Sequence, residues 1–260
     1  MSKRMRDLDQ NIADLISLSP EALDEFGREM ARKSRRHSVE SRPERCERCG
    51  DHLPGAVIFG SGRWCECGKL ANAARRAIER IDPAGEMTFE ALKDLDPSAA
   101  KARDALQQIA SGERERGAFL FGSPGRGKTH LSIALARRVL DRGGLCGVFS
   151  LAGLVSQIQE TYGFSDVDES KAQIIEGVCR HDVVILDDIG KEHTSPDVES
   201  IVYQLVDGIY SARRTLIASS NLPGGDFVER YDGAVLSRLG GMCEKIVIRG
   251  DDRRKAAWAW

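Results

Sequence analysis

The residues of this chain best suited to chemistry are the eight from Gly122 to Thr129, which fit the pattern G-x-x-x-x-G-K-[ST]. An apolar run at 118–121 precedes them and an apolar helical pattern follows, so strand, loop and helix occur in the order of a phosphate-binding P-loop. Glycines within the loop let backbone N–H groups turn toward a phosphate without a Cβ in the way. We therefore predict that this loop binds a nucleoside triphosphate.

The end of the loop has the side chains that phosphate and metal binding require. Lys128 is predicted to reach the β- and γ-phosphates, and Thr129 to place its hydroxyl on Mg²⁺. The following helix adds its positive N-terminal end. A chance Gly-rich turn ending in Lys-Thr is the alternative, and the order of the flanking elements argues against it. The predicted nucleotide contacts in this stretch are Gly122, Ser123, Pro124, Gly125, Arg126, Gly127, Lys128, Thr129 and His130.

An acidic element follows the P-loop. Residues 183–186 are Val-Val-Ile-Leu, and Asp187 and Asp188 come directly after them. A strand buried on both faces has room for acids only at its C-terminal edge, where open α/β sheets bind ligands. This pattern is typical of a Walker B element, so we expect Asp187 to hold Mg²⁺ and Asp188 to orient or deprotonate the attacking water. Glu192 is a second candidate for the water-orienting role, because the side chain of Asp188 is shorter than that of the Glu that many ATPases have at this position.

A third apolar run, at 215–218, leads into polar residues that end at Asn221. If this strand lies between the P-loop strand and the Walker B strand, the amide of Asn221 falls beside the γ-phosphate. An amide at that position can hydrogen-bond both the attacking water and a γ-oxygen.

Short apolar runs alternate with helical patterns from Gly117 onward, which is the rhythm of a parallel α/β sheet. The five expected strands lie near residues 118–122, 145–150, 182–187, 214–219 and 245–249. The expected helices cover residues 69–81, 97–109, 131–140, 151–162, 170–179 and 198–210. Residues 88–95 suggest a short extended segment. The fold class is therefore α/β, with a five-stranded parallel sheet flanked by helices.

Four of the seven cysteines cluster as Cys46-x-x-Cys49 and Cys65-x-Cys67, with fifteen residues between the pairs. Each pair can offer two thiolates to one metal, so the set predicts a structural Cys₄ zinc site. Such a site leaves no coordination position for catalysis, and its expected role is to fold a small module. An iron–sulfur or redox site, or no metal, are the alternatives.

Composition limits the class of protein and its location. Hydrophobic residues make up 41% of the chain, and no apolar run approaches the roughly 18 residues of a membrane span. The basic N-terminus has no apolar stretch behind it that would indicate a secretory signal. We therefore expect a cytoplasmic protein with no membrane contact. The formal net charge of −2 hides basic stretches at 28–48 and 249–255, so it does not argue against a nucleic-acid partner.

The expected organisation has four parts. An N-terminal helical and basic segment covers 1–45, and the zinc-binding module covers 46–70. Linker helices then cover 71–112, and an ATPase domain covers 113–260.

Four stretches of the chain carry a family resemblance: GSPGRGKTHLSIALA, VVILDDIGKE, LIASSNLP and VLSRLGGMCEKIVIRGDDRRK. Over about residues 113–260 the chain resembles the AAA+ ATPases of the DnaC/DnaI family, which are bacterial replicative-helicase loaders. The resemblance implies an ASCE-type P-loop sheet with an extra strand between the P-loop and Walker B strands, and no large C-terminal lid. It implies ATP hydrolysis at subunit interfaces, self-association through the ATPase domain, and delivery of a hexameric DnaB-type helicase onto single-stranded DNA. In that family an N-terminal adaptor, zinc-bearing in some members, contacts the helicase.

The resemblance also assigns two arginines. Arg238 matches the arginine finger that completes a neighbouring subunit's site, and a guanidinium suits the charge of a transferring phosphoryl group. Arg254 matches a family arginine that senses nucleotide. The predicted catalytic set is thus Lys128, Asp188, Asn221 and Arg238. DNA contacts are expected in the 151–180 insertion, whose basic residues include Lys171 and Arg180.

Two classes of function stay open. In the first, ATP drives helicase loading, and an IstB-type transposition ATPase with the same core is the runner-up; the predicted zinc module favours the loader. In the second, the chain is a nucleotide-switched helicase-binding module that hydrolyses little ATP. The short side chain of Asp188 motivates this second class.

Overall fold

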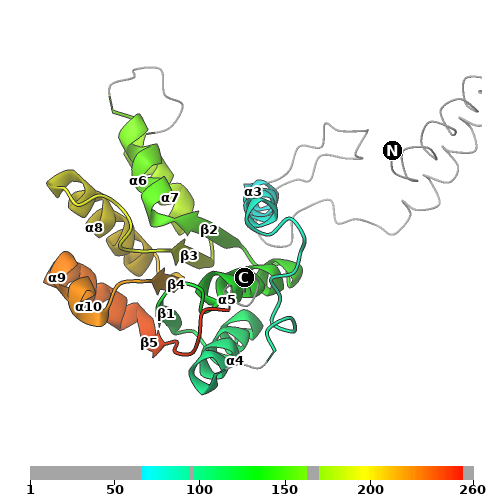
Figure 1. The fold of residues 1–260 in the computed structure, drawn as a ribbon. Helices are drawn as coiled ribbons and strands as arrows, with labels where there is room; N and C mark the ends of the chain where they lie inside the picture. Colours follow the sequence, from blue (N-terminus) through cyan, green and yellow to red (C-terminus); the bar gives the residue numbers. More distant parts are fainter. Residues whose placement is uncertain (1–65, 94–95, 163–169, 254–260) are drawn as a thin grey trace, which may run out of the picture. The chain divides into compact units, whose positions relative to one another are not determined.

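The computed structural model describes residues 66–93, 96–162 and 170–253 (Figure 1). The chain divides into two compact units, residues 1–63 and 64–260, and the described residues belong to the second. The predicted N-terminal helices, three of the four predicted zinc ligands (Cys46, Cys49 and Cys65) and Arg254 lie outside the described residues.

Five parallel strands form one sheet in the order β2-β3-β4-β1-β5. Their bounds are β1 Gly117–Phe121, β2 Cys146–Ser150, β3 Val183–Asp187, β4 Thr215–Ser220 and β5 Cys243–Val247. All five lie within a few residues of their predicted positions, because a strand buried on both faces reads as a continuous apolar run. The β4 strand separates the P-loop strand β1 from the acid-tipped strand β3, which confirms the expected extra strand.

Helices cover both faces of the sheet (Figure 1). One layer contains α3 (Glu66–Ile81), α4 (Pro97–Ser111) and α5 (Lys128–Asp141). The other contains α6 (Leu151–Glu160), α7 (Lys171–Cys179), α8 (Pro196–Ser211), α9 (Gly224–Arg230) and α10 (Gly233–Met242). The chain is therefore a three-layer α/β/α sandwich at the described residues.

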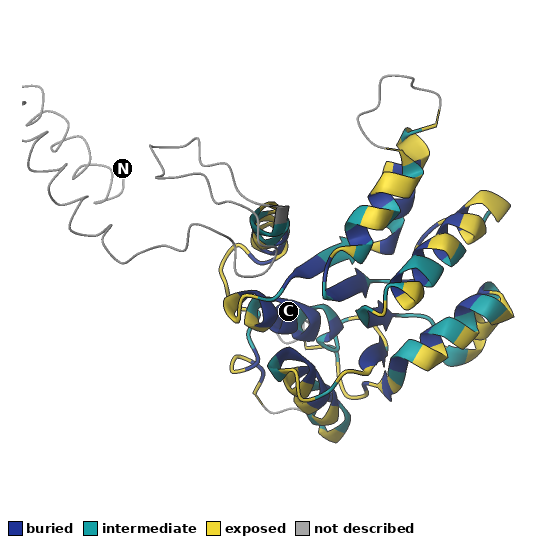
Figure 2. Cartoon of the chain, turned by 180° about the vertical axis from the view of Figure 1, so that it is seen from behind, coloured by how far each residue is buried: buried dark blue, intermediate teal, exposed yellow. Residues whose placement is uncertain are grey.

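Alternation along the strands divides the core between the two layers. In β1, Ala118 and Leu120 pack with the α3, α4 and α5 side, whereas Phe119 and Phe121 pack with the α6 to α10 side. Figure 2 shows the sheet as almost wholly buried between exposed outer helix faces. The C-terminal ends of the strands are thereby held rigidly at one edge, where the site is built.

The region predicted as linker helices packs against the sheet. Ala74 and Ile78 of α3 and Leu106 of α4 are buried in the same core as β1 and α5. The start of α4 follows from local chemistry, since Asp96 caps it through the Ser98 N–H at 2.9 Å and Pro97 occupies its first position. The extended segment expected at 88–95 is wrong at its start, because residue 88 is a bend and residues 89–91 form a turn.

Two short helices were not predicted. The α9 and α10 helices occupy the stretch between β4 and β5, where glycines at 224, 225, 233, 240 and 241 conceal the helical pattern. The Asp232 side chain caps α10 by accepting from two backbone N–H groups at 2.8 Å. Among the described residues, no helix combines the length and apolarity that crossing a membrane would require.

Candidate nucleotide-binding site

The predicted P-loop connects β1 to α5 as expected. Its glycines Gly122, Gly125 and Gly127 all have positive φ, at 156°, 79° and 87°. A Cβ on Gly122 would lie 2.4 Å from the carbonyl oxygen of Ile248, so only glycine fits the base of the loop. Lys128 begins α5, which sets the helix N-terminus directly after the loop. This cradle of backbone is the shape that a phosphate group requires.

The Lys128 side chain curls back over the loop. Only 5% of Lys128 is exposed, and its Nζ donates to the carbonyl oxygens of Gly122 at 2.6 Å and Ser123 at 3.0 Å. These contacts hold the ammonium beside the phosphate cradle.

Thr129 and Asp187 bring two oxygen ligands together. The Thr129 hydroxyl donates to Asp187 Oδ2 at 2.8 Å, and the Ser219 hydroxyl donates to Asp187 Oδ1. A hydroxyl and a carboxylate side by side at the strand edge suit Mg²⁺, which prefers oxygen ligands and binds few protein groups. The residues present therefore fit the metal that the sequence predicts.

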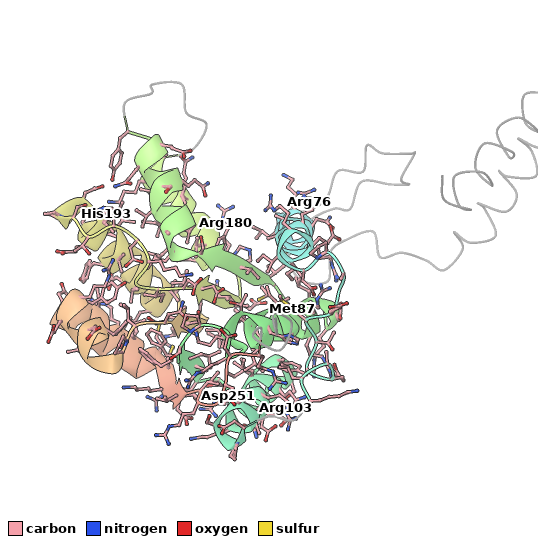
Figure 3. All side chains as sticks on the ribbon, viewed as in Figure 1. Arg76, Met87, Arg103, Arg180, His193 and Asp251 are labelled. Atoms are coloured by element: carbon pink, nitrogen blue, oxygen red, sulfur yellow. The ribbon has the colours of Figure 1, made fainter. Side chains whose placement is uncertain are left out.

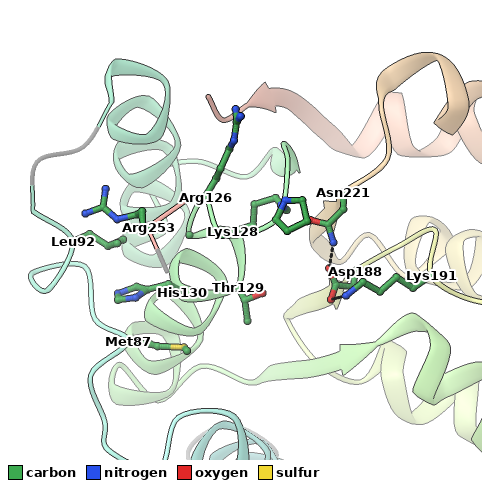
Figure 4. A pocket seen from close by; sticks show the side chains of 13 residues that line it. Met87, Leu92, Arg126, Lys128, Thr129, His130, Asp188, Lys191, Asn221 and Arg253 are labelled. Atoms are coloured by element: carbon green, nitrogen blue, oxygen red, sulfur yellow. Dashed lines mark hydrogen bonds and ion pairs between the residues drawn. The ribbon is translucent and has the colours of Figure 1, made fainter. Parts of the chain in front are cut away.

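Asp188 is held by three neighbours. Its backbone is left-handed, with φ at 59°, and its N–H donates to Ser219 Oγ at 2.9 Å. The amide of Asn221 donates to Asp188 Oδ1 at 2.7 Å, while Lys191 Nζ lies 2.5 Å from Asp188 Oδ2 (Figure 4). Asn221 thus reaches the acidic strand end, as its predicted position on the intervening strand required.

Lys128, Thr129 and Asp188 line one cavity of about 480 Å³ at the C-terminal edge of the sheet, together with Lys191 and Asn221 (Figure 4). Its walls combine the loop, the strand ends and a segment before α4. The lining residues are Met87, Leu92, Pro124, Gly125, Arg126, Gly127, Lys128, Thr129, His130, Asp188, Lys191, Asn221 and Arg253. The structure therefore brings together most of the predicted nucleotide-binding and catalytic residues.

Four lining residues were missed by sequence reasoning: Met87, Leu92, Lys191 and Arg253. Met87 and Leu92 lie far before the P-loop in an irregular segment without a motif, which His130 tethers through its ring Nε2, 2.8 Å from the Thr88 carbonyl oxygen. Arg253 precedes the predicted Arg254, and its N–H donates to the Gly125 carbonyl at 3.0 Å. Only the adjacent family match at Arg254 signalled that the C-terminal stretch approaches the loop.

Arg126 points away from the loop interior toward the end of β5. Its guanidinium donates to the Ile248 carbonyl at 3.3 Å. The carboxylate of Asp252 occupies the space beside Gly125, where a Cβ would lie 1.6 Å from Asp252 Oδ1. The stretch after β5 therefore packs closely on the P-loop.

Glu192 does not line the cavity. Only 2% of its side chain is exposed, and Oε1 receives Arg230 Nε at 3.3 Å and the Tyr231 hydroxyl. Burial, together with the bond to Glu192, raises the pKa of Tyr231 well above its usual value. Glu192 therefore joins the Walker B turn to α9, and the structure does not place it for the water-orienting role that the sequence suggested.

Arg238 lies outside the cavity of its own chain. It projects from α10, where Nε donates to Asp207 Oδ1 at 2.6 Å and NH2 donates to the Tyr203 hydroxyl at 3.1 Å. The hydrogen bond to Asp207 raises the pKa of Arg238. The guanidinium also stacks on Tyr203, 4.9 Å from the ring centroid. A fixed arginine remote from its own site is the arrangement that a role in a neighbouring subunit would need.

The predicted zinc site and the predicted DNA-contacting insertion lie partly outside the described residues. Cys67 lies in α3, and the remaining predicted zinc ligands fall outside the described residues, so zinc stays a prediction. No group of three or more metal-ligating side chains occurs within the described ranges.

Arg180, labelled in Figure 3, pairs with Glu176 at 2.9 Å, and Lys171 begins α7. The segment 163–169 between α6 and α7 is not described.

A P-loop on β1, paired acids at the end of β3 and a polar amide on the strand between them define a P-loop nucleotide-binding protein of the AAA+ fold class. Comparison with known proteins agrees. A model of the IstB-like ATP-binding protein family matches residues 69–258, and the chain belongs to that family.

Curated relatives with functional names are of two kinds. The replicative helicase loader DnaC of Escherichia coli K12 is 28% identical over 126 residues, which cover 47% of this chain and 49% of DnaC. An insertion sequence ATP-binding protein of Sinorhizobium fredii is 27% identical over 168 residues, covering 61% of this chain and 54% of that protein. The chain thus spans about half the length of the curated relatives it matches.

Solved structures agree on the fold. A crystal structure of the DnaC helicase loader matches with a TM-score of 0.57 at 21% identity, covering 64% of this chain and 98% of that one. DnaA from Aquifex aeolicus bound to AMPPCP matches with a TM-score of 0.53 at 18% identity, covering 66% of this chain and 52% of that one. At these identities the likeness supports the fold alone.

Proposed function

We propose that this protein is an ATPase that uses ATP to load a replicative DnaB-type helicase onto single-stranded DNA. The observation that carries the ATPase part is the meeting of Thr129 and Asp187 at 2.8 Å beside the P-loop cradle. The same cavity is lined by the Thr129 hydroxyl, the Asp188 carboxylate and the Lys128 ammonium, a gathering of polar groups that is typical of a functional site.

The P-loop and the two strand ends beside it have separate roles in the proposed reaction. The loop N–H groups and Lys128 bind the phosphates, while Thr129 and Asp187 hold the metal. Mg²⁺, when bound, neutralises charge that develops on the phosphate oxygens. Asp188 accepts a hydrogen bond from the attacking water, and Asn221 fixes the carboxylate through its amide at 2.7 Å.

The apolar wall of the cavity suits the nucleoside. Met87 and Leu92 line the cavity together with the loop, and Arg253 completes that side (Figure 4). Apolar side chains with a few polar groups are the usual surroundings of a base. His130 supports this wall by its contact with the Thr88 carbonyl.

The proposed assembly needs more than one subunit. Arg238 is fixed by Asp207 and Tyr203 at a place that its own cavity does not reach. We assign it to the cavity of a neighbouring subunit, where a guanidinium would stabilise the transferring phosphoryl group. Self-association through the ATPase domain follows from this assignment.

The helicase partner is proposed from the DnaC relative, which is 28% identical over 126 residues. The decisive experiment is co-purification of the full chain with a replicative helicase, with and without ATP. A matched truncation removes residues 1–63, because α3 begins at Glu66 and packs in the ATPase core. We expect the full chain to bind and the truncated chain to lose binding while retaining ATP affinity. Failure of the full chain to bind any replicative helicase contradicts the loader proposal.

The N-terminal adaptor is proposed to hold zinc through Cys46, Cys49, Cys65 and Cys67. Elemental analysis of the purified full chain tests this, and one zinc per chain is expected. A Cys46→Ser and Cys49→Ser double variant should lose the metal and helicase binding together. Retention of zinc in that variant contradicts the assigned ligands.

A transposition ATPase is the second candidate, favoured by the Sinorhizobium fredii relative, which matches over more residues than DnaC does. The two proposals differ in what the protein binds. ATP-dependent binding of double-stranded DNA and stimulation of a transposase, with no helicase binding, would favour this alternative.

A further inference from the structure

Lys191 holds Asp188 through a contact that is exposed to water. Its Nζ lies 2.5 Å from Asp188 Oδ2 across a tight turn, in which Asp188 and Gly190 have φ of 59° and 103°. The side chain of Lys191 is 59% exposed and that of Asp188 is 30% exposed. An ion pair this accessible to water contributes little stability, so the lysine can leave Asp188 at small cost.

The other cations of the cavity are engaged differently. Lys128 and Arg126 donate to backbone carbonyls near the loop, and Arg253 donates to the Lys93 carbonyl at 2.5 Å. Figure 4 shows Lys191 extending to Asp188 beside Asn221, with Arg253 on the opposite side of the cavity. Lys191 therefore lies beside Asp188 and Asn221, the two residues that the proposed function assigns to the attacking water.

Taking the proposed ATPase function as given, we infer that Lys191 recognises the γ-phosphate and distinguishes ATP from ADP. The γ-phosphate brings negative charge close to Asp188, between Lys128 and Asn221. A lysine on a flexible four-carbon stem can transfer its ammonium from the carboxylate to that phosphate. ADP has no group at this position, so with ADP the lysine stays on Asp188.

This transfer also frees the carboxylate for catalysis. Asn221 keeps Asp188 in place through Oδ1 at 2.7 Å, and the Ser219 hydroxyl keeps its backbone N–H at 2.9 Å. Departure of Lys191 leaves Oδ2 open to accept a hydrogen bond from water. The side chain thus couples the arrival of the third phosphate to the availability of the proposed base.

The test measures binding of Mg·AMPPCP and Mg·ADP to the full chain by calorimetry. The variants are Lys191→Gln, the conservative Lys191→Arg, and Lys101→Gln as a control. Lys101 suits this purpose because it forms an ion pair with Glu244 and does not line the cavity. Lys191→Gln should weaken AMPPCP binding about three- to tenfold, the range of one charged contact by a half-exposed side chain, and leave ADP binding unchanged. Lys191→Arg should retain most of the preference for AMPPCP over ADP.

The outcomes separate this inference from the proposed function. Equal weakening of both nucleotides, or no change of either, overturns the role of Lys191 while ATP binding by the natural sequence stands. Absence of AMPPCP binding by the natural sequence overturns both. Thermal unfolding of each variant, followed by circular dichroism, verifies that the fold is intact.

Discussion

The hydroxyl of Thr129 donates to Oδ2 of Asp187 at 2.8 Å, and this contact joins the helix after the P-loop to a strand two places away in the sheet. The two residues are far apart in the chain, and β4 lies between their elements. Their meeting shows that the sheet order β3-β4-β1 places the two proposed magnesium ligands side by side.

Thr129→Val should impair the use of Mg²⁺ more than the binding of nucleotide. Valine keeps the shape of threonine but removes the hydroxyl, leaving Asp187 with its bond from Ser219. Loss of one metal ligand should raise the Mg²⁺ concentration for half-maximal ATP turnover by about tenfold or more. Thr129→Ser, which retains the hydroxyl, is the matched control. An unchanged Mg²⁺ dependence in the valine variant would refute the ligand assignment.

Asp82→Asn should destabilise the protein in a pH-dependent way. Burial by itself would raise the pKa of Asp82, but hydrogen bonds from the Met87 and Glu86 N–H groups and from Arg137 outweigh it and hold the pKa below its usual value. Because the folded-state pKa is depressed, the carboxylate stabilises the protein above its unfolded pKa of about 4, and this stability is lost as pH falls through the lower folded-state value.

Urea unfolding followed by circular dichroism measures this effect. At pH 7 the asparagine variant should lose about 1–3 kcal/mol of unfolding free energy, and the gap should shrink below about pH 4. Asp141→Asn serves as the control, since its pair with Arg75 is exposed and should contribute under about 1 kcal/mol. A gap that stays constant from pH 7 to pH 3 would show that the charge of Asp82 is irrelevant.

Tyr231→Phe should test the cluster that buries Glu192. The hydroxyl of Tyr231 bonds to Glu192 Oε1, and Glu192 Oε2 accepts from the Gly190 N–H at 2.9 Å in the Walker B turn. Removing the hydroxyl leaves a buried carboxylate less satisfied, at a cost of about 1–3 kcal/mol in unfolding free energy. Tyr162→Phe is the control, because Tyr162 is exposed and bonds to the exposed Asp197. Equal small losses of unfolding free energy in both variants would argue against a stabilising role of the Glu192 cluster.

The sheet and the loop were predictable because their signals are local. The run Val183 to Leu186 is apolar since both faces of β3 are buried, and the P-loop pattern specifies its own strand and helix. Met87, Leu92 and Arg253 were not predictable, since only the tertiary fold brings them to the loop. The water-orienting role predicted for Glu192 failed for a related reason. Its spacing from Asp188 gives no information on Tyr231, which bonds to it in the fold.

Arg238→Ala should abolish ATP turnover while preserving ATP binding. The guanidinium is absent from the cavity lining of its own chain, so its loss leaves the nucleotide contacts in place. An arginine finger supplied by a neighbour stabilises only the transition state, and its removal should lower kcat by about 10³-fold or more. Asp207→Asn, which keeps the arginine but weakens its tether at 2.6 Å, should give a smaller loss.

Mixing variants distinguishes a role in trans from one in cis. Lys128→Ala subunits lack the phosphate-binding ammonium but retain Arg238, whereas Arg238→Ala subunits retain a complete cavity. If Arg238 acts on a neighbour, a mixture of these two inactive variants recovers part of the turnover, because an intact cavity can then meet an intact arginine. Replacing the first partner with a Lys128→Ala, Arg238→Ala double variant should give no recovery. A mixture as inactive as its components would place Arg238 outside catalysis in trans and leave its pair with Asp207 as a structural contact.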